Sequence, residues 1–560
     1  MLADVLVVGA GPVGLTMAAE LARHGVRCRV IDKLPAPSGY CKAIGVTPRT
    51  LEVWEDMGVA RAMIDAGIWL RGLRTIVAGK MHETLQDFPE LPYGNLGIPQ
   101  YTTERILAEH LARQGVNVER GMGLASLRDD GRRVAVELKG PDGRTESTEV
   151  RYVVGCDGAH SAVRHALDIG FPGDRFPMEF MLGDVVVDWD VPRGVSVLSV
   201  VPRENDAPDF LVVIPQPDRN RYRVSMLASE QPGEDGGEQH GIMSERPGPS
   251  LAQMQEVVDR LLPGKPRLSE LRWSSLFRIS MRLADKYRVG NAFIAGDAAH
   301  IHPPTGGQGM NTGIQDAYNL AWKMALVLRG AADPRLLDSY EAERRPVGAE
   351  VVERTRQASL QFGRDRGKKE NRLEDTQILV NYRGSKWVRD ASNARKKTAL
   401  RAGDRAPDAH GLRQDQVSFP LRLFEVLCGT AHVLVCYVAG RAAKQQVAEL
   451  EALAHALSAA YPDAVRVVPI AAKGVKLPQP VGVTLLADGE GAFARAYAAK
   501  SGSTFLIRPD GYIGYVADTL DRAGLFDFFK RSLGVRSPAP IPTARSPRRR
   551  RPGQTAGETC

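Results

Sequence analysis

The chain has 560 residues, of which 43% are hydrophobic and 25% are charged, and its formal net charge is +8. This length exceeds what a single hydrophobic core usually organises, so we expect two or three domains, and the ordinary composition excludes a chain that is disordered throughout. The longest uncharged apolar stretch, residues 5–19, contains Gly and Pro and is shorter than the roughly 18 residues of a membrane span. No basic segment precedes it, as one would in a signal peptide, so we expect a soluble, cytoplasmic protein without a membrane partner.

Half of the positive excess lies at the C-terminus, where residues 541–560 hold five arginines and one glutamate. This segment is too rich in Pro, Gly and Arg to pack, so residues 539–560 are predicted to form a disordered, Arg-rich tail. The remaining excess is small for the length, and we therefore expect no nucleic-acid partner, with a weak electrostatic partner of the tail as the alternative. The six cysteines form no CxxC pair, so neither a structural zinc site nor a disulfide is expected.

The first motif is a glycine-rich turn between a buried strand, residues 5–8, and a helix. Gly9 permits a tight turn, Gly11 lets the backbone approach a pyrophosphate, and Gly14 lets helix and strand pack closely. Asp32 ends the next strand at the distance from which an acid accepts hydrogen bonds from an adenosine ribose. The pattern predicts a dinucleotide site but does not separate NAD from FAD. The residues expected there are Gly9, Gly11, Pro12, Val13, Gly14, Asp32 and Lys33.

A second glycine-rich segment follows nearly three hundred residues later. A short apolar strand at residues 292–295 is followed by Asp297, in the position where open α/β sheets bind ligands. Prolines and glycines of residues 303–309 form a stiff crossing, and a helix is predicted from about Met310. The exposed N–H groups and positive end of that helix suit an anion or a developing negative charge.

Together these residues resemble the class A flavoprotein monooxygenases, the single-component aromatic hydroxylases. In that family a GD segment holds the ribityl chain of FAD, the downstream helix start lies beside the flavin pyrimidine, and a DG segment helps to hold FAD. The resemblance covers residues 3–390, and it implies that the two glycine-rich loops hold opposite ends of one FAD. The matching positions are Gln100, Arg105, Asp157, Gly158, Gly296, Asp297, Pro304, Gly307, Gly309, Met310 and Asn311.

The same resemblance leaves three assignments less defined. His160 and Arg164 match a part of the DG segment that is implicated in NAD(P)H use. Lys42 stands where many relatives have an Arg near the FAD phosphates; Lys keeps the charge but loses the planar fork, and a solvated loop Lys is the alternative. His300 and His302 have no acidic or Cys partner nearby in sequence, so a structural role is favoured and no metal is expected.

The resemblance implies an α/β fold in which a Rossmann-like FAD-binding domain carries a mixed-sheet substrate domain and is followed by a thioredoxin-like domain. The last of these resembles the C-terminal domain of phenol and polyketide hydroxylases; lacking CxxC, it is expected to serve packing or contact within a homodimer rather than redox chemistry. The predicted ranges are 1–175 plus 277–395 for FAD binding, 176–276 for the substrate sheet, 396–538 for the thioredoxin-like domain and 539–560 for the tail.

The implied reaction uses non-covalent FAD, NADPH or NADH, and dioxygen. Reduced flavin would form a C4a-hydroperoxide, whose distal oxygen is transferred to a small phenolic or polyketide-derived aromatic substrate. Epoxidation or Baeyer–Villiger oxidation on the same scaffold is the first alternative, because a fold does not determine its chemistry. A nicotinamide dehydrogenase that uses the first loop alone is the second, but it leaves the later motifs unexplained. No side chain is assigned as catalytic or as substrate-binding.

Overall fold

The structure is a computed structural model that describes residues 3–41, 43–77, 79–203, 206–228, 247–303, 307–360, 373–393 and 400–534. Lys42, Pro304 and the Arg-rich tail of residues 539–560 lie outside the described residues. Within them, no helix combines the length and the apolar character that crossing a membrane requires.

The first sheet explains why motifs far apart in sequence can meet. Val8 of β1 lies beside Gly155 of β12, and Gly155 lies beside Ile294 of β19, with all three strands parallel. Because the carboxyl ends of parallel strands share one edge, the segments that follow each strand begin at the same level of the sheet. The strands, in spatial order, are β18 (Arg288–Val289), β19 (Ala292–Ile294), β12 (Tyr152–Gly155), β1 (Val5–Val8), β2 (Cys28–Asp32) and β8 (Val118–Arg120).

Helices cover this sheet, and α1 and α7 pack against each other within the hydrophobic core that they share with its strands. Two small three-stranded sheets flank it: β11 (Thr145–Val150), β10 (Val134–Lys139) and β9 (Gly123–Asp129); and β3 (Gly45–Val46), β7 (Asn95–Gly97) and β4 (Ile68–Leu70). The helices are α1 (Pro12–Arg23), α2 (Pro48–Asp56), α3 (Ala60–Asp65), α4 (Gln100–Arg113), α5 (Ala162–Ala166), α7 (Gln308–Leu328) and α8 (Asp338–Leu360), with 3-10 turns η1 (Gly296–Ala298) and η3 (Pro334–Leu337).

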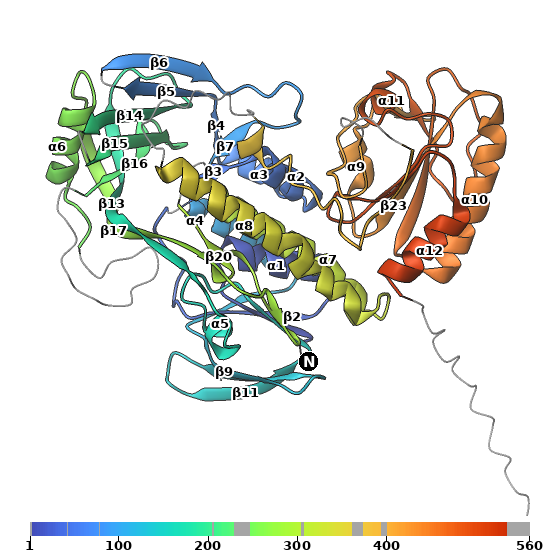
Figure 1. Cartoon of the computed structure of the whole chain (residues 1–560), viewed down its shortest axis with the longest axis horizontal. Helices are drawn as coiled ribbons and strands as arrows, with labels where there is room; N and C mark the ends of the chain where they lie inside the picture. Colours follow the sequence, from blue (N-terminus) through green and yellow to red (C-terminus); the bar gives the residue numbers. More distant parts are fainter. Residues whose placement is uncertain are drawn as a thin grey trace, which may run out of the picture.

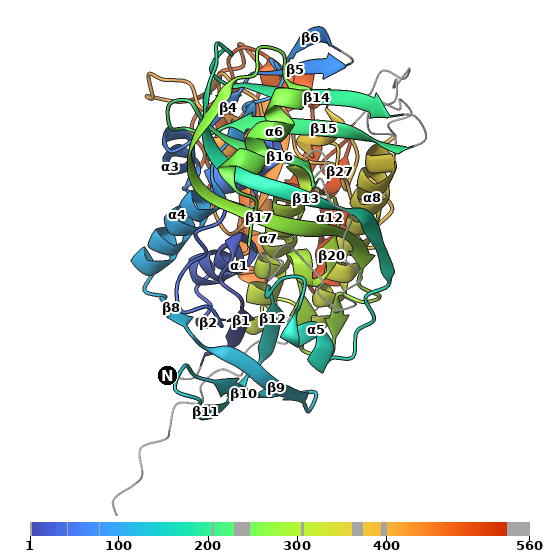
Figure 2. The same cartoon turned by 90° about the vertical axis from the view of Figure 1, so that its left-hand side faces the viewer.

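An eight-stranded mixed sheet lies above α1 and α7 in Figure 2. It is wider than the range 176–276 because it recruits β5 and β6 from before residue 90 and β20 from beyond β19. Helix α6 (Leu251–Leu261) packs on its outer face. Its strands, in spatial order, are β20 (His300–Ile301), β17 (Arg267–Leu283), β13 (Gly173–Asp188), β16 (Arg221–Leu227), β15 (Asp206–Pro215), β14 (Val195–Arg203), β5 (Gly72–Val77) and β6 (Lys80–Leu85).

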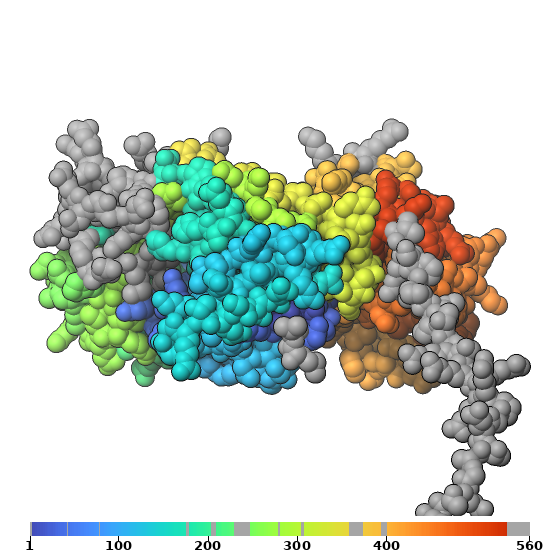
Figure 3. All heavy atoms as spheres, turned by 90° about the horizontal axis from the view of Figure 1, so that it is seen from below, coloured from blue at the N-terminus to red at the C-terminus, as the bar shows by residue number. Residues whose placement is uncertain are grey.

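The C-terminal residues form a third layered unit, which lies next to α2 and α7 in Figure 1 and at one end of the molecule in Figure 3. Its central strands run β24, β23, β26, β27, with β23 parallel to β24 and antiparallel to β26. The elements are β21 (Arg389–Ala391), β22 (Leu412–Gln414), α9 (Leu423–Leu427), β23 (His432–Val438), α10 (Ala443–Ala460), β24 (Val465–Ala471), β25 (Leu486–Asp488), α11 (Ala492–Ala496), β26 (Thr504–Ile507), β27 (Ile513–Ala517) and α12 (Arg522–Ser532).

Candidate active site

The first glycine loop has two glycines that the protein itself requires and one that it does not. Gly9 has φ +100°, and a Cβ there would lie 2.4 Å from the carbonyl oxygen of Cys156. A Cβ on Gly14 would lie 1.9 Å from the Gly9 oxygen, so helix α1 and β1 can approach only without side chains. A Cβ on Gly11, by contrast, would meet nothing within 4 Å. Gly11 therefore keeps a surface of bare backbone open at the start of α1, as binding of a pyrophosphate would need.

Asp32 lies at the end of β2, directly against this loop. Its Oδ2 accepts a hydrogen bond from the Ala10 N–H at 2.8 Å, and its Oδ1 accepts one from the Leu34 N–H at 2.8 Å. The Arg120 guanidinium is 3.5 Å from Oδ2. A carboxylate has about four acceptor positions, so these contacts leave capacity for ribose hydroxyls. Asp32 thus orders the glycine loop, while its ribose contact stays a prediction, as does any contact of the exposed Lys33.

The GD segment, residues 295–301, lies against the first loop. Gly296 has φ +62°, and a Cβ there would be 2.9 Å from Cγ2 of Val13 in α1. A Cβ on Gly313 of α7 would be 2.6 Å from the same methyl group. Glycines thus allow α1, η1 and α7 to meet around one side chain, and half-buried Asp297 lies in that turn. The two glycine-rich loops are therefore neighbours in space, as a cofactor held by both requires.

Helix α7 begins beside this turn without a side-chain cap. Gly307 is its N-cap with φ +66° and has no side chain to bond the first N–H groups. Asn311 faces the protein: its Nδ2 donates to the carbonyls of Gly45 at 2.9 Å and Gly307 at 2.7 Å, and its Oδ1 accepts from the Thr47 N–H at 3.0 Å. An uncapped N-terminus with its partial positive charge suits a negatively charged ring edge. The contacts of Gly309, Met310 and Asn311 with flavin stay predictions.

The DG segment, residues 157–164, is held by hydrogen bonds within the protein. Asp157 accepts hydrogen bonds from the Ser161 hydroxyl at 2.5 Å and from the Ala162 N–H, at the start of α5, at 2.6 Å. Burial raises the pKa of the Asp157 carboxyl group. Arg164 is buried and donates to the carbonyls of Ala159 at 2.7 Å and Ala298 at 3.0 Å. Arg164 therefore joins the DG and GD segments.

Three other predicted residues of this region have different surroundings. Gln100 accepts from the Ala43 N–H at 3.0 Å and donates to Glu104 at 2.8 Å. Arg105 is exposed and pairs with Glu109, one turn along α4. His160 is exposed in the turn before α5. The predicted contacts of Gln100, Arg105 and Gly158 with FAD, and of His160 and Arg164 with NAD(P)H, stay predictions.

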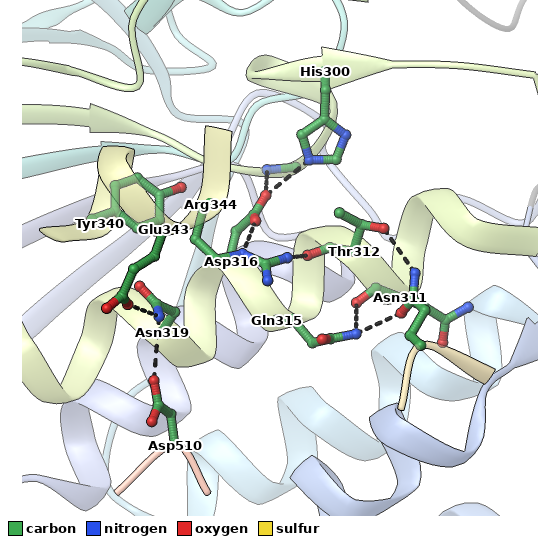
Figure 4. Close-up of polar contacts among 12 residues, drawn as sticks. His300, Asn311, Thr312, Gln315, Asp316, Asn319, Tyr340, Glu343, Arg344 and Asp510 are labelled. Atoms are coloured by element: carbon green, nitrogen blue, oxygen red, sulfur yellow. Dashed lines mark hydrogen bonds and ion pairs between the residues drawn. The ribbon is translucent and has the colours of Figure 1, made fainter. Parts of the chain in front are cut away.

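Asp316 of α7 is a functional candidate that the sequence reasoning missed. Its Oδ2 accepts from the Gly296 N–H at 3.2 Å and lies 2.9 Å from His300 Nε2, and its Oδ1 is 2.7 Å from Arg344 Nε (Figure 4). Although burial alone would raise the pKa of Asp316, the Arg344 and His300 partners lower it. The carboxylate thus holds the Gly296 backbone before Asp297 and the His300 side chain after it. An acid between apolar Ile314 and Ala317 was the available sequence signal.

His300 is held by its contact with Asp316, as the structural role that the sequence favours would require. Burial lowers the pKa of the neighbouring His302 to about 4. No group of three potential metal-ligating side chains lies together among the residues that the structure describes.

The inner face of the eight-stranded sheet is aromatic at one end and polar at the other. Strand pairing places Phe180 between Leu227 and Phe277, and it places Asp184 between Arg223 and Trp273. The aromatic cluster also includes Phe210 and contacts Val352 of α8, so this face points toward the FAD-binding layer. The register of strand pairing thus identifies the residues that face the FAD-binding layer, which the alternation of apolar and polar residues in the sequence did not.

The geometry fits FAD. Three segments from parallel strands meet at one edge, with open backbone at Gly11, an acid at the end of β2 and an uncapped helix start, beneath a sheet face lined by aromatic rings. Adenosine diphosphate requires the first two features, and an anionic ring edge requires the third.

Comparisons with known proteins agree with this geometry. The model of a family described as an FAD binding domain matches residues 2–355. Pentachlorophenol 4-monooxygenase of Sphingobium chlorophenolicum is 32% identical over 546 residues, which are 93% of this chain and 95% of that protein. 6-Methylpretetramide 4-monooxygenase of Streptomyces rimosus is 40% identical over 363 residues, which are 64% of this chain and 61% of that protein.

The crystal structure of aklavinone-11 hydroxylase with FAD and aklavinone aligns with a TM-score of 0.75 at 26% identity, over 95% of this chain and 99% of that one. The chain therefore belongs to the family described as an FAD binding domain and is an FAD-dependent monooxygenase.

Proposed function

We propose that this enzyme hydroxylates a phenolic or polyketide-derived aromatic ring, using NADPH or NADH and dioxygen. The observation that carries the proposal is the meeting of three motif segments at one sheet edge beneath a face lined by aromatic rings. The substrates for which the relatives are named agree in class: pentachlorophenol, a pretetramide and aklavinone all contain aromatic rings.

The residues that would hold FAD divide by its two ends. The glycine loop and Asp32 would take the adenosine diphosphate, and the GD segment with the start of α7 would take the ribityl chain and the ring. When bound, FAD supplies the acceptor for the hydride of NAD(P)H and the means to activate dioxygen. The uncapped N-terminus of α7 would stabilise negative charge at the pyrimidine edge. The aromatic face would exclude water and hold the substrate ring.

The C-terminal residues, 396–538, are proposed to be a thioredoxin-like domain without redox function. Its support is the central strand order β24-β23-β26-β27 with helix α10 joining the two parallel strands. Burial raises the pKa of Cys428 to about 11 and that of Cys436 to about 12, so neither thiol forms the thiolate that exchange requires near neutral pH. We place the enzyme in the cytoplasm and regard a homodimer as compatible with this assignment.

The test is a panel of monocyclic phenols and polycyclic polyketides, incubated with enzyme, FAD and either nicotinamide. We expect one class of aromatic to accelerate NAD(P)H oxidation and to yield a product one oxygen atom heavier by mass spectrometry. An epoxide or a Baeyer–Villiger lactone has the same mass, so NMR of the product separates ring hydroxylation from both. Oxidation of NAD(P)H that no aromatic accelerates, with no oxygenated product, would contradict the proposal.

A further inference from the structure

Helix α7 carries a continuous polar stripe although it lies in the core. The stripe residues recur at helical spacing, with Gln315 and Asp316 adjacent, and are each at most 4% exposed: Gln308, Thr312, Gln315, Asp316, Asn319 and Lys323. Outside the helix, their partners come from the GD segment, from α8, and from residues 375–377 and 510. Figure 4 shows Asp316 and Asn319 of this stripe with their partners His300, Arg344, Glu343 and Asp510. Buried polar groups that must all be hydrogen-bonded fix the position of a helix along its axis more narrowly than apolar packing does.

The far end of the stripe is joined to the turn between β26 and β27. Arg508 donates from both terminal nitrogens to Glu343 of α8, at 2.7 and 2.9 Å, and its Nε donates to Asp510 at 3.0 Å. Asp510 in turn accepts from Asn319 Nδ2 at 3.2 Å, and Glu343 accepts from Lys323 Nζ at 2.7 Å. This bidentate, charge-assisted geometry is directional, so the turn holds α7 and α8 in one relative position.

The same helix reaches the flavin site within a short distance. Asp316, one turn before Asn319, holds the GD segment, and Asn311 lies about 12 Å from Asn319 at 1.5 Å of rise per residue. A shift of α7 along its axis would therefore move Asp316 and the helix start together, because a packed helix moves as a rigid element.

We propose that Arg508 and Asp510 are positioning residues for FAD. They act through Glu343 and Asn319, and they make the C-terminal domain the anchor that sets the axial position of α7. Neither residue needs to touch the cofactor. The C-terminal domain thus contributes to the geometry of a site whose binding residues all precede residue 330.

The experiment measures FAD affinity of refolded apoprotein by quenching of flavin fluorescence, together with the thermal unfolding temperature. Arg508→Met keeps the length of the side chain and removes its donors. The control is Arg405→Met: Arg405 is also an interface arginine, with a side chain 8% exposed against 3% for Arg508, but its ion pair is with Glu52 of α2. We expect both variants to unfold at lower temperature, but only Arg508→Met to weaken FAD binding, by about three- to thirty-fold.

Two further variants sharpen the result. Arg508→Lys keeps the charge without the planar fork and should recover part of the affinity. Asp510→Asn is nearly isosteric and should also weaken FAD binding. If Arg508→Met does not fold, the FAD affinity of Asp510→Asn tests the proposal in its place. Unchanged affinity in a folded Arg508 or Asp510 variant, or an equal loss in the Arg405 control, would overturn the proposal. Failure of both Arg508→Met and Asp510→Asn to fold would assign these residues to stability alone and overturn it as well.

Discussion

At the scale of single residues, the glycine loop separates what the fold requires from what the cofactor requires. Gly11 has φ −76°, which any residue adopts, and a Cβ there would meet no protein atom. Gly11→Ala should therefore leave the stability of the apoprotein within about 0.5 kcal/mol of the unmutated chain. The same methyl group would stand where the pyrophosphate approaches, so FAD affinity should fall at least about ten-fold.

Chemical denaturation of the apoprotein and a fluorescence titration with FAD measure the two effects. Gly14→Ala serves as the contrast, because its Cβ would overlap the Gly9 oxygen and should destabilise the apoprotein itself. A Gly11→Ala protein that binds FAD with normal affinity would show that the pyrophosphate lies elsewhere.

The glycines and Asp32 could be predicted from sequence because their constraints are local: a turn, a close approach and a strand end within thirty residues. Asp316 could not be placed in the same way, because its partners Gly296, His300 and Arg344 come from two other elements. The inward-facing residues of the substrate sheet were likewise hidden until strand pairing fixed which side each one faces.

At the scale of elements, the packing of α7 on α1 depends on glycine at one helical position. Alanine normally stabilises a helix interior by about 1 kcal/mol relative to glycine. At Gly313 the sign should reverse, because a Cβ would lie 2.6 Å from Val13 Cγ2 and 2.9 Å from Gly296 Cα. We predict that Gly313→Ala destabilises the protein by about 1–3 kcal/mol and weakens FAD binding by displacing the GD segment.

Urea denaturation and FAD titration check this, and a second substitution tests the mechanism. Val13→Ala removes the methyl group that Gly313→Ala would strike, so the double variant should regain part of the stability that the single variant loses. A Gly313→Ala protein more stable than the original would contradict the packing account.

Helix α7 itself was predictable, from Ile314, Ala317 and Leu320 on one face, although it begins two residues before the expected Met310. The edge strand β6 of the substrate sheet was not, because every residue of β6 is exposed and its sequence shows no alternation of apolar and polar residues. Edge strands of this kind are recognised by their neighbours rather than by their own sequence.

At the scale of the whole molecule, the C-terminal domain is docked by buried groups that respond to pH. His432 lies against Trp322 of α7, and burial, with nearby Arg508, lowers the pKa of its imidazole from 6.5 to about 4. The folded state therefore binds fewer protons than the unfolded state between these values. Stability is fully present above pH 6.5 and is lost as pH falls toward 4, by about 2–3 kcal/mol.

His432→Gln cannot take up that proton, so we predict a flatter decline of the thermal unfolding temperature between pH 6.5 and pH 4. The exposed His455 of α10, replaced in the same way, provides the control and should leave the decline unchanged. An identical acid-induced decline in His432→Gln and the original protein would contradict this assignment.

The central strands of this domain, the helix α10 and the turn at Pro509, Asp510 and Gly511 have signals in the local sequence. Its docking could not, because the ion network joins Arg508 to Glu343 and Lys323 across more than 160 residues of chain. Local sequence patterns identify the element that carries each charged residue, but they do not show which of these residues pair with one another.

The central claim, that this chain is an FAD-dependent monooxygenase acting on aromatic rings, is tested most directly by labelled dioxygen. Purified holoenzyme is supplied with NAD(P)H, the aromatic that best accelerates cofactor oxidation, and isotopically labelled oxygen gas in unlabelled water. We predict that mass spectrometry finds one labelled oxygen atom in each molecule of product and the second in water. A product whose new oxygen comes from solvent, or complete recovery of the label as hydrogen peroxide, would contradict the account.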